Sequence, residues 1–418
     1  MVDLLIIGAG ERGSVYAGYA AKHPNRCRVV GVAEPRQSAR QRLADAHGIP
    51  LEYQFADWRD AVALPAFANA ATVTVQDSMH ADVAIPLAQK GYHLLLEKPM
   101  ATSAADCEAI AAAINDQGLM CAVAHVLRYT PYTKKLKDLL KRDSIGDIVN
   151  VQHLEPVGYW HQAHSFVRGN WGKEAESTFM LMAKSCHDID LLAYLIDQPC
   201  SMVSSFGGLQ HFKRDVMPEG ASGRCLECQV EPECPYSAKK IYLDAVKAGH
   251  SSWPVSVITE DRTPKGVLEA LRSGPYGRCV YACDNDVVDH QVVNLQFKNG
   301  VTASFTMTGF TEAQQFRKTR IFGTHGQIVG DGDTISVHTF LTEETIAYDM
   351  KLLYGETTDG HGGGDHALMD HFVRAIAEKS PHLILSPIDE SLATHRVVFA
   401  AETSRRQGKT IQLREFKQ

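Results

Sequence analysis

The sequence predicts two domains of different architecture: an N-terminal doubly wound α/β domain and a C-terminal α+β domain built on an open, mostly antiparallel sheet. Two patterns lead to this fold class. Over residues 1–127, strand-like apolar runs alternate with helical segments, as in a parallel sheet. Over residues 128–418, several segments read as antiparallel strands, and two helices close the chain. The length of 418 residues agrees with two or three domains.

The first βαβ unit carries a glycine-rich turn. The apolar run of residues 4–7 meets Gly8, Gly10 and Gly13, and a helical pattern follows. Gly8 permits the tight turn, Gly10 lets backbone N–H groups approach a pyrophosphate, and Gly13 allows the helix to pack close to the strand. The pyrophosphate would then lie on the positive end of the helix dipole. The pattern therefore predicts a Rossmann domain that binds NAD.

The end of the second strand-like run favours one dinucleotide over the other. Glu34 ends this run about twenty residues beyond the last glycine, where a carboxylate accepts hydrogen bonds from a ribose diol. A carboxylate also repels a 2′-phosphate, which favours NAD over NADP. Arg36 weakens this preference, because a guanidinium can accept the phosphate.

The remaining elements can be placed approximately. In the first domain we expect strands at 71–75, 93–95 and 120–123, and helices at 38–47, 81–89 and 104–116. In the second we expect strands at 149–154, 203–207, 287–298, 301–309 and 316–322, and final helices at 365–378 and 389–407. Asn299 and Gly300 predict a type I′ hairpin turn. The stretch 208–285, rich in Pro, Gly and Cys, is interpreted as an insertion.

Bulk properties exclude several partners. The net charge of −7 disfavours nucleic acid, and the sequence has no apolar run of membrane-spanning length. The first strand follows the N-terminus directly, which leaves no room for a signal peptide. We therefore expect a cytoplasmic protein whose ten cysteines are mostly reduced.

A positioned lysine follows the strand at 93–95. Glu97, Lys98 and Pro99 come at the carboxyl end of this strand, where α/β folds bind ligands. Pro99 fixes its own φ and favours an extended Lys98, so the ammonium has a defined direction. Such a lysine can bind a substrate hydroxyl, stabilise an alkoxide or relay a proton. The alternative is a surface lysine in a loop.

Three segments resemble the Gfo/Idh/MocA family: GAGERG near the start, EKPMA at 97–101, and the helix opening CHDIDLLAYL at 186–195. The resemblance spans most of the chain, with the insertion added. It implies a Rossmann domain, a C-terminal domain whose open sheet faces the nicotinamide, and Lys98 and His187 on either side of the reacting carbon. It also implies a homo-oligomer, a dimer or tetramer.

The chain departs from the family pattern at one catalytic position. Many members carry an Asp four residues before the helix histidine, where this chain has Ala183 followed by Lys184. Lys184 is a candidate replacement that binds substrate or lowers the pKa of its neighbours. His187 is the preferred general base, because its ordinary pKa suits proton transfer near neutral pH. The alternative for His187 is a core histidine.

Other polar residues complete the expected site. An Arg at the position of Arg128 lies near the nicotinamide and substrate in the family, and the aromatic stretch 159–171 suits a carbohydrate. The expected cofactor contacts are Gly8, Gly10, Glu11, Arg12, Gly13, Glu34, Arg36, Asp77, His80, Glu97, Lys98 and Arg128. The expected substrate contacts are Lys98, Arg128, Tyr159, Trp160, His161, Arg168, Trp171, Lys184, His187 and His290.

The insertion contains a cysteine group. Four thiolates from this region could bind a structural zinc ion: Cys225, Cys228, Cys234 and Cys283. An iron–sulfur cluster, disulfides or free thiols are the alternatives.

Three functions agree with these features. The first is an NAD-dependent oxidoreductase that transfers a hydride between the cofactor and a secondary hydroxyl of a sugar, glycoside or cyclitol. The second is a glycoside hydrolase that uses NAD transiently, by C3 oxidation and elimination. The third is a non-catalytic NAD-binding sensor.

Overall fold

The computed structural model describes residues 1–312, 317–356, 361–414 and 416. Its N-terminal region is a parallel sheet of six strands in the order β3-β2-β1-β4-β5-β6. The strands are β1 (Val2–Ile7), β2 (Cys27–Ala33), β3 (Gln54–Phe55), β4 (Ala70–Val73), β5 (His93–Leu96) and β6 (Cys121–Val123). The helices of this domain are α1 (Glu11–Lys22), α2 (Gln37–His47), α3 (Trp58–Ala63), α4 (His80–Gln89) and α5 (Ala104–Asp116). The doubly wound Rossmann prediction is confirmed.

The second sheet has nine strands in the order β14-β13-β12-β11-β7-β10-β9-β8-β15. Only β7 and β10 pair in parallel, so the prediction of an open, mostly antiparallel sheet is confirmed for the described residues. The strands are β7 (Ile148–Pro156), β8 (Cys200–Gly208), β9 (His290–Phe297), β10 (Thr302–Thr308), β11 (Lys318–Gly323), β12 (Gly326–Gly330), β13 (Thr334–Thr339), β14 (Thr345–Asp349) and β15 (Ile411–Gln412).

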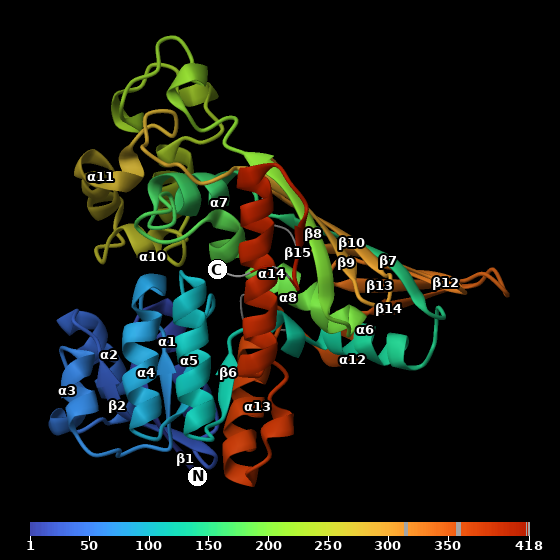
Figure 1. Ribbon diagram of the computed structural model, residues 1–418. Helices are drawn as coiled ribbons and strands as arrows, with labels where there is room; N and C mark the ends of the chain where they lie inside the picture. The colour runs from blue at the N-terminus through green and yellow to red at the C-terminus, as the bar shows by residue number, and fades with distance from the viewer. Residues whose placement is uncertain (313–316, 357–360, 415, 417–418) are drawn as a thin grey trace.

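Two helices of the second region, α13 (Gly364–Glu378) and α14 (Ile388–Gln407), also pack against the first domain. The same region contains η3 (Val126–Tyr129), α6 (Pro131–Lys141), α7 (Tyr159–His161), the π-helix η4 (Gln162–Arg168), α8 (Met180–Ile196) and α12 (Met350–Tyr354). Helix α13 packs on the first sheet, since Leu368 and Phe372 share a core with Leu4 and Tyr16. Helix α14 contacts α5 and β6 of the first domain and α8 and β8 of the second, and Figure 1 shows it running alongside both.

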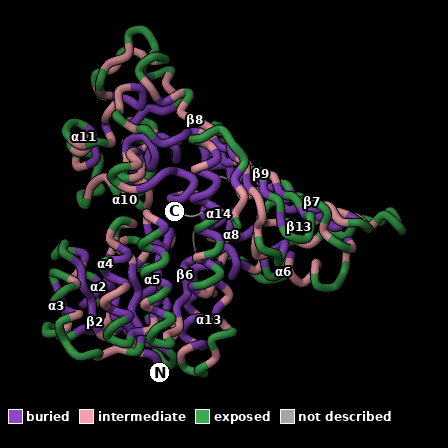
Figure 2. The backbone as a smooth tube through the Cα atoms, in the orientation of Figure 1, coloured by how far each residue is buried: buried purple, intermediate pink, exposed green. Residues whose placement is uncertain are grey.

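The insertion after β8 forms a compact unit with its own small cores. Its helices are α9 (Asp244–Lys247), α10 (Val255–Ile258) and α11 (Pro264–Ser273), with a short 3-10 turn η9 (Pro275–Gly277). In Figure 1 it lies across from the carboxyl ends of the Rossmann strands, with α10 nearest to them. Figure 2 shows burial concentrated in the two sheets and α8, while the tips of the insertion are exposed.

One local prediction is wrong. The β9–β10 hairpin forms, but a type I′ turn needs positive φ at both central residues, and Asn299 is not among the residues with positive φ. Gly300 has φ of 90°, and its N–H donates to the Phe297 carbonyl at 3.0 Å. The turn therefore spans 297–300, one residue earlier than predicted.

The predicted strand at 316–322 corresponds to β11, although residue 316 lies outside the described residues. The short strands β3 and β15 and the strands β12 to β14 were not predicted. Among the described residues, no helix has the length and apolar character needed to cross a membrane.

Candidate active site

A cavity of about 670 Å³ lies between the two domains. The first domain contributes the start of α1 and the ends of β4 and β5, and the second contributes α6, α8, β7 and β11. The insertion closes the cavity with Trp253, Val257 and Tyr276. The carboxyl edge of the parallel sheet is therefore one wall of an interdomain cleft, where open α/β sheets bind ligands.

The glycine turn forms a cradle at one end of this cavity. Gly8 has φ of 93°, and a Cβ there would lie 2.5 Å from the Thr74 carbonyl oxygen. A Cβ at Gly13 would lie 1.9 Å from the Gly8 oxygen, so the turn and helix touch directly. Gly10 precedes α1 and lines the cavity. The first N–H groups of α1 lack helical partners, so this cradle fits a dinucleotide pyrophosphate.

Glu34 ties the cradle to the next strand. Its carboxylate accepts hydrogen bonds from the Ala9 N–H at 2.9 Å and from Arg36 Nε at 2.8 Å. Glu34 is only 4% exposed and does not line the cavity, whereas Arg36 does. Together with the Arg36 N–H, the guanidinium holds the pKa of Glu34 below its ordinary value despite its burial. In this structure the Arg36 guanidinium therefore covers the acidic residue that was expected to meet the ribose.

The turn after β5 is anchored to α1 through Glu97. One carboxylate oxygen accepts from Arg12 Nε at 2.6 Å and from the Tyr16 hydroxyl at 2.5 Å. The other accepts from the Lys98 N–H at 3.0 Å. Arg12 also forms an ion pair with Asp365 at 2.6 Å. These contacts orient the backbone from which the Lys98 side chain extends.

Lys98 and His187 line the same cavity, although they come from different domains. Lys98 Nζ donates to the Ala183 carbonyl at 2.7 Å, one turn before His187 on α8. His187 is 5% exposed, and its Nδ1 has no hydrogen-bond partner among the described residues. Burial lowers the pKa of His187 well below its usual range, and the charges of Lys98 and Arg317 lower it further. The imidazole is therefore neutral near pH 7, and it is a weaker base than the ordinary histidine on which the prediction rested.

Lys184 belongs to a charged cluster in the wall of the same cavity. Its Nζ lies 3.2 Å from Glu155 Oε1, and Arg317 Nη2 lies 3.1 Å from Glu155 Oε2. Arg317 Nε also pairs with Asp188, and His153 Nε2 lies 3.1 Å from the same carboxylate. Burial lowers the pKa of Lys184, although Glu155 opposes this shift. Arg317 was missed in the sequence, since a lone Arg before a strand carries no signal.

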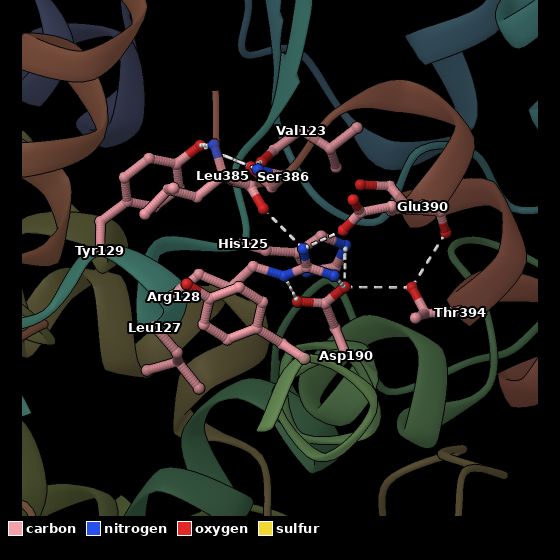
Figure 3. Close-up of polar contacts among 12 residues, drawn as sticks. Val123, His125, Leu127, Arg128, Tyr129, Asp190, Leu385, Ser386, Glu390 and Thr394 are labelled. Carbon is pink, nitrogen blue, oxygen red and sulfur yellow. Dashed lines mark hydrogen bonds and ion pairs between the residues drawn. The ribbon is translucent and has the colours of Figure 1, made fainter. Parts of the chain in front are cut away.

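Arg128 does not reach the cavity. Its Nε and Nη2 atoms donate to the two Asp190 oxygens, each at 2.7 Å, and Nη1 lies 2.6 Å from Glu390 (Figure 3). Thr394 Oγ1 also donates to Asp190 at 3.1 Å. Arg128 is 2% exposed. The guanidinium that was expected near the nicotinamide instead crosslinks η3, α8 and α14.

Several other predicted residues also make structural contacts away from the cavity lining. His80 is buried, with Nδ1 2.7 Å from the Pro99 carbonyl. Arg168 donates to the carbonyls of Arg278 at 2.7 Å and Tyr236 at 2.8 Å, inside the insertion region. His290 pairs with Asp289 at 2.9 Å. None of these three lines the cavity.

The aromatic stretch divides between the cavity wall and the layer behind it. Trp171 lines the cavity and donates from Nε1 to Asp77 at 2.9 Å, which joins the two domains. Trp160 and His161 lie behind the wall, with ring centroids 4.9 and 5.0 Å from that of Trp253. Tyr159 packs towards Tyr236 and does not line the cavity. Of the residues predicted to bind cofactor, Gly10, Glu11, Arg12, Arg36, Asp77, Glu97 and Lys98 do line it.

The zinc prediction finds no support. Within the described residues, no three His, Cys, Asp or Glu side chains gather in a way that could hold a metal ion. The ten cysteines are unpaired thiols. Cys225 instead accepts a contact from Arg168 Nη2 at 3.4 Å, while Cys283 donates to the Cys279 carbonyl at 3.3 Å. The guanidinium of Arg168 therefore lies against the cysteine group.

Comparison with known proteins gives the family. The model of the Gfo/Idh/MocA oxidoreductase family with an NAD-binding Rossmann fold matches residues 2–125, and its C-terminal α/β domain model matches residues 137–413. The oxidoreductase YteT of Bacillus subtilis is 24% identical over 311 residues, which is 71% of this chain and 70% of YteT. The levoglucosan dehydrogenase of Pseudarthrobacter phenanthrenivorans is 25% identical over 203 residues, 46% of this chain and 50% of that enzyme.

Solved structures agree on the fold. Levoglucosan dehydrogenase in complex with NADH and levoglucosan superposes with a TM-score of 0.71 at 19% identity, over 99% of both chains. An NAD-binding oxidoreductase from Klebsiella pneumoniae gives 0.73 at 15% identity, over 100% of this chain and 99% of that one. The family models extend over both domains, so the chain belongs to the Gfo/Idh/MocA family of NAD-binding oxidoreductases and is of the NAD(P)-dependent dehydrogenase class.

Proposed function

We propose that the protein is an NAD-dependent dehydrogenase that acts on a secondary hydroxyl of a sugar, glycoside or cyclitol. The observation that carries this proposal is the meeting of Lys98, His187 and the glycine cradle in one interdomain cavity. The named activities of the levoglucosan and scyllo-inositol dehydrogenases among the relatives support this substrate class. NAD is proposed as the cofactor because named relatives use NAD or NADH, and its ribose diol would meet Glu34 once the Arg36 guanidinium moves from this carboxylate.

The cofactor would lie on the cradle formed by Gly8, Gly10 and Gly13, with Arg36 at its ribose end. When bound, NAD supplies the acceptor or donor of the hydride. The fit rests on the open face of Gly10, where the nearest side-chain atom to a built Cβ is Arg36 Nη2 at 3.6 Å. The protein itself must therefore handle the hydroxyl proton.

His187 and Lys98 divide this task. The imidazole of His187 is neutral and its residue lines the cavity, so it can take the proton as a general base. The Lys98 ammonium uses one N–H on the Ala183 carbonyl and keeps two for the substrate oxygen. A cation held there stabilises the negative charge that develops on that oxygen as the proton leaves. Lys184 adds a second cation to the same wall.

The test compares three variants on a panel of sugars, glycosides and cyclitols with NAD, and follows the absorbance of the reduced nicotinamide. Lys98→Met and His187→Asn should each lower kcat/KM about 10²- to 10⁴-fold, the usual contribution of acid–base groups. Lys90→Met, at an exposed lysine of the same domain, is the matched control and should keep full activity. Unchanged turnover in Lys98→Met would contradict the role proposed for Lys98, and binding of NAD without turnover of any compound in the panel would favour the sensor.

One observation keeps the hydrolase as a second candidate. The insertion adds an aromatic wall to the cavity, with Trp253 and Tyr276 beside His164, so the cavity extends beyond the reacting centre. A larger glycoside would use this wall through its C–H faces. Release of free sugar without net formation of NADH, measured in the same panel, would favour the hydrolase over the dehydrogenase.

A further inference from the structure

The charged groups of the C-terminal wall are unequally exposed to the cavity. Lys184 and Arg317 line the cavity and are 14% and 19% exposed, whereas their partners Glu155 and Asp188 are 2% and 0% exposed and do not line it. Within the described residues, the carboxylates that do line the cavity come from the Rossmann domain: Glu11, Asp77 and Glu97. The wall opposite the Rossmann domain therefore presents cations and hides their counter-charges.

Lys98, which comes from the Rossmann domain, adds a third cation to the cavity. Its charge lowers the pKa of both Lys184 and His187, which places the ammonium within electrostatic reach of both side chains. Each cation is bound to fixed partners on one side: Lys98 to the Ala183 carbonyl, and Lys184 to Glu155. Such preorganised donors give a bound anion strong, charge-assisted hydrogen bonds without further reorganisation.

Arg317 provides the geometry that recognises an oxyanion. Its Nε and Nη2 atoms contact Asp188 and Glu155, while Nη1 has no hydrogen bond to the described residues. A guanidinium so oriented keeps part of its planar donor fork for a ligand. Thr319, which follows it by two residues, also lines the cavity and bonds to His153 at 2.8 Å.

From this arrangement we infer that the substrate is an anionic sugar, whose carboxylate or phosphate group binds Arg317 and Lys184 while its reacting hydroxyl meets Lys98 and His187. The inference rests on the proposed function for the role of the hydroxyl. A bound anion would accept charge-assisted hydrogen bonds from the donors that Glu155 and Asp188 leave unused, whereas a neutral sugar offers only weaker hydroxyl acceptors. Arg317 is thus a specificity-determining residue, and the anionic group fixes which hydroxyl faces His187.

The experiment measures binding by calorimetry to the protein saturated with NADH, a state in which an alcohol binds without being oxidised. The probes are glucose, glucuronate and glucose 6-phosphate, and the corresponding galactose series. We expect one anionic sugar to bind about 10- to 100-fold more tightly than its neutral parent, as for a charge-assisted pair of hydrogen bonds. The carboxylate and phosphate arms distinguish the two sources of charge.

Arg317→Gln should reduce this preference to within about threefold, whereas Arg320→Gln, at an exposed arginine in the adjoining strand β11 that does not line the cavity, should keep it. If circular dichroism shows that Arg317→Gln does not fold, Arg317→Lys keeps the charge but loses the fork, and should still lower the preference. Equal binding of neutral and anionic sugars, no binding of any anionic sugar, or a preference that survives the Arg317 variants would overturn the inference.

The same series separates the two proposals. Turnover of neutral sugars without an anion preference would leave the dehydrogenase standing and remove the inference. If an anionic sugar binds in a way that depends on Arg317, but no probe forms NADH when NAD is supplied, the anion site would stand and the proposed dehydrogenase activity would fall.

Discussion

Two charged regions lie on successive turns of helix α8. Both contain the same types of side chain, but in the described part of the chain one leaves hydrogen-bond donors unpaired and the other pairs them within the protein. His187 faces the cavity with Lys98 and Arg317, whereas Asp190, three residues on, is closed between Arg128 and Thr394. Both regions are buried and both combine cations with carboxylates. In the first, donors are left for a ligand; in the second, the protein itself provides the partners (Figure 3).

The difference shows why residue type alone does not identify a site. Arg128 and Asp190 satisfy each other with two parallel hydrogen bonds of 2.7 Å, so neither has a donor or acceptor to offer. His125 lies at the boundary between the two regions, with its ring centroid 5.9 Å from that of His187 and its Nε2 3.7 Å from Asp190. A substitution in the Arg128–Asp190 region should therefore mainly change stability, and a substitution in the His187 region should mainly change catalysis.

The largest expected effect is a loss of stability when the buried Arg128–Asp190 pair is broken. Arg128→Met should lower the free energy of unfolding by about 3–5 kcal/mol, because it leaves the Asp190 carboxylate buried without its counter-charge. Arg28→Met is a matched control: Arg28 makes the same two-contact pair with Asp3, at 2.6 and 3.0 Å, but is 62% exposed. The control should cost at most about 1 kcal/mol. Urea unfolding of both variants measures the difference, and equal losses would mean that burial of the pair is unimportant.

The second effect is the pH dependence of stability that comes from two buried histidines, His125 and its neighbour His395, whose ring centroids are 5.6 Å apart. Burial lowers the pKa of His125 to about 3 and that of His395 to about 4. The unfolded chain takes up a proton on each near pH 6.5, and the folded chain does not, so the free energy of unfolding falls as the pH is lowered from 6.5 towards 4. Each histidine adds up to about 1.4 kcal/mol per pH unit to this slope. The stability contribution is complete above pH 6.5.

His125→Gln removes one of the two groups that take up a proton on unfolding. It should therefore reduce the dependence of the unfolding free energy on pH by the contribution of one histidine, whatever its effect on stability at pH 7. Denaturant unfolding at pH 7, 6, 5 and 4 measures the slope in the two proteins. His47→Gln, at a less buried histidine on α2, is the control and should change the slope less. A slope that His125→Gln leaves unchanged would show that the imidazole titrates normally in the folded protein.

The smallest effect concerns a single hydrogen bond to the buried network. Thr394→Val removes the hydroxyl that donates to Asp190 at 3.1 Å and retains the shape of the side chain. The carboxylate keeps both Arg128 contacts, so the loss should be about 1 kcal/mol in unfolding free energy, with kcat/KM unchanged. A large loss of activity here would mean that the two regions of α8 are coupled.

The backbone of the site was largely predictable from the sequence. Gly8, Gly10 and Gly13 predicted the cradle because the tight turn and close helix packing exclude side chains, and Lys98 followed from its position after a parallel strand. These predictions use local rules, with the partner elements only a few dozen residues away. The Rossmann strands β1, β2, β4, β5 and β6 were placed to within about two residues for the same reason, whereas the two-residue β3 was not predicted.

The side-chain partners were not predictable, because they come from distant parts of the chain. Arg317 reaches α8 across 129 residues to meet Asp188, and Arg128 reaches Glu390 across 262 residues. No periodicity encodes such pairs, so Arg128 looked as available for a ligand as Lys98 did. Trp253 and Tyr276 were missed as wall residues because the insertion lacks the regular patterns that place core elements. Strands β12 to β14 were missed because their alternation is interrupted by short turns.

Helix α14 and the insertion join the two domains by different kinds of contact. With 20 residues it is about 30 Å long, and it contacts α5 and β6 on one side and α8 and β8 on the other. Because this single helix packs against both domains, it resists hinge bending between them. The remaining wall is the insertion, which meets the Rossmann domain through exposed contacts such as that from Ser38 Oγ to Glu260 at 2.7 Å. The insertion is therefore held to the Rossmann domain by solvent-exposed contacts, whereas α14 fixes the alignment of the two sheets through its packing.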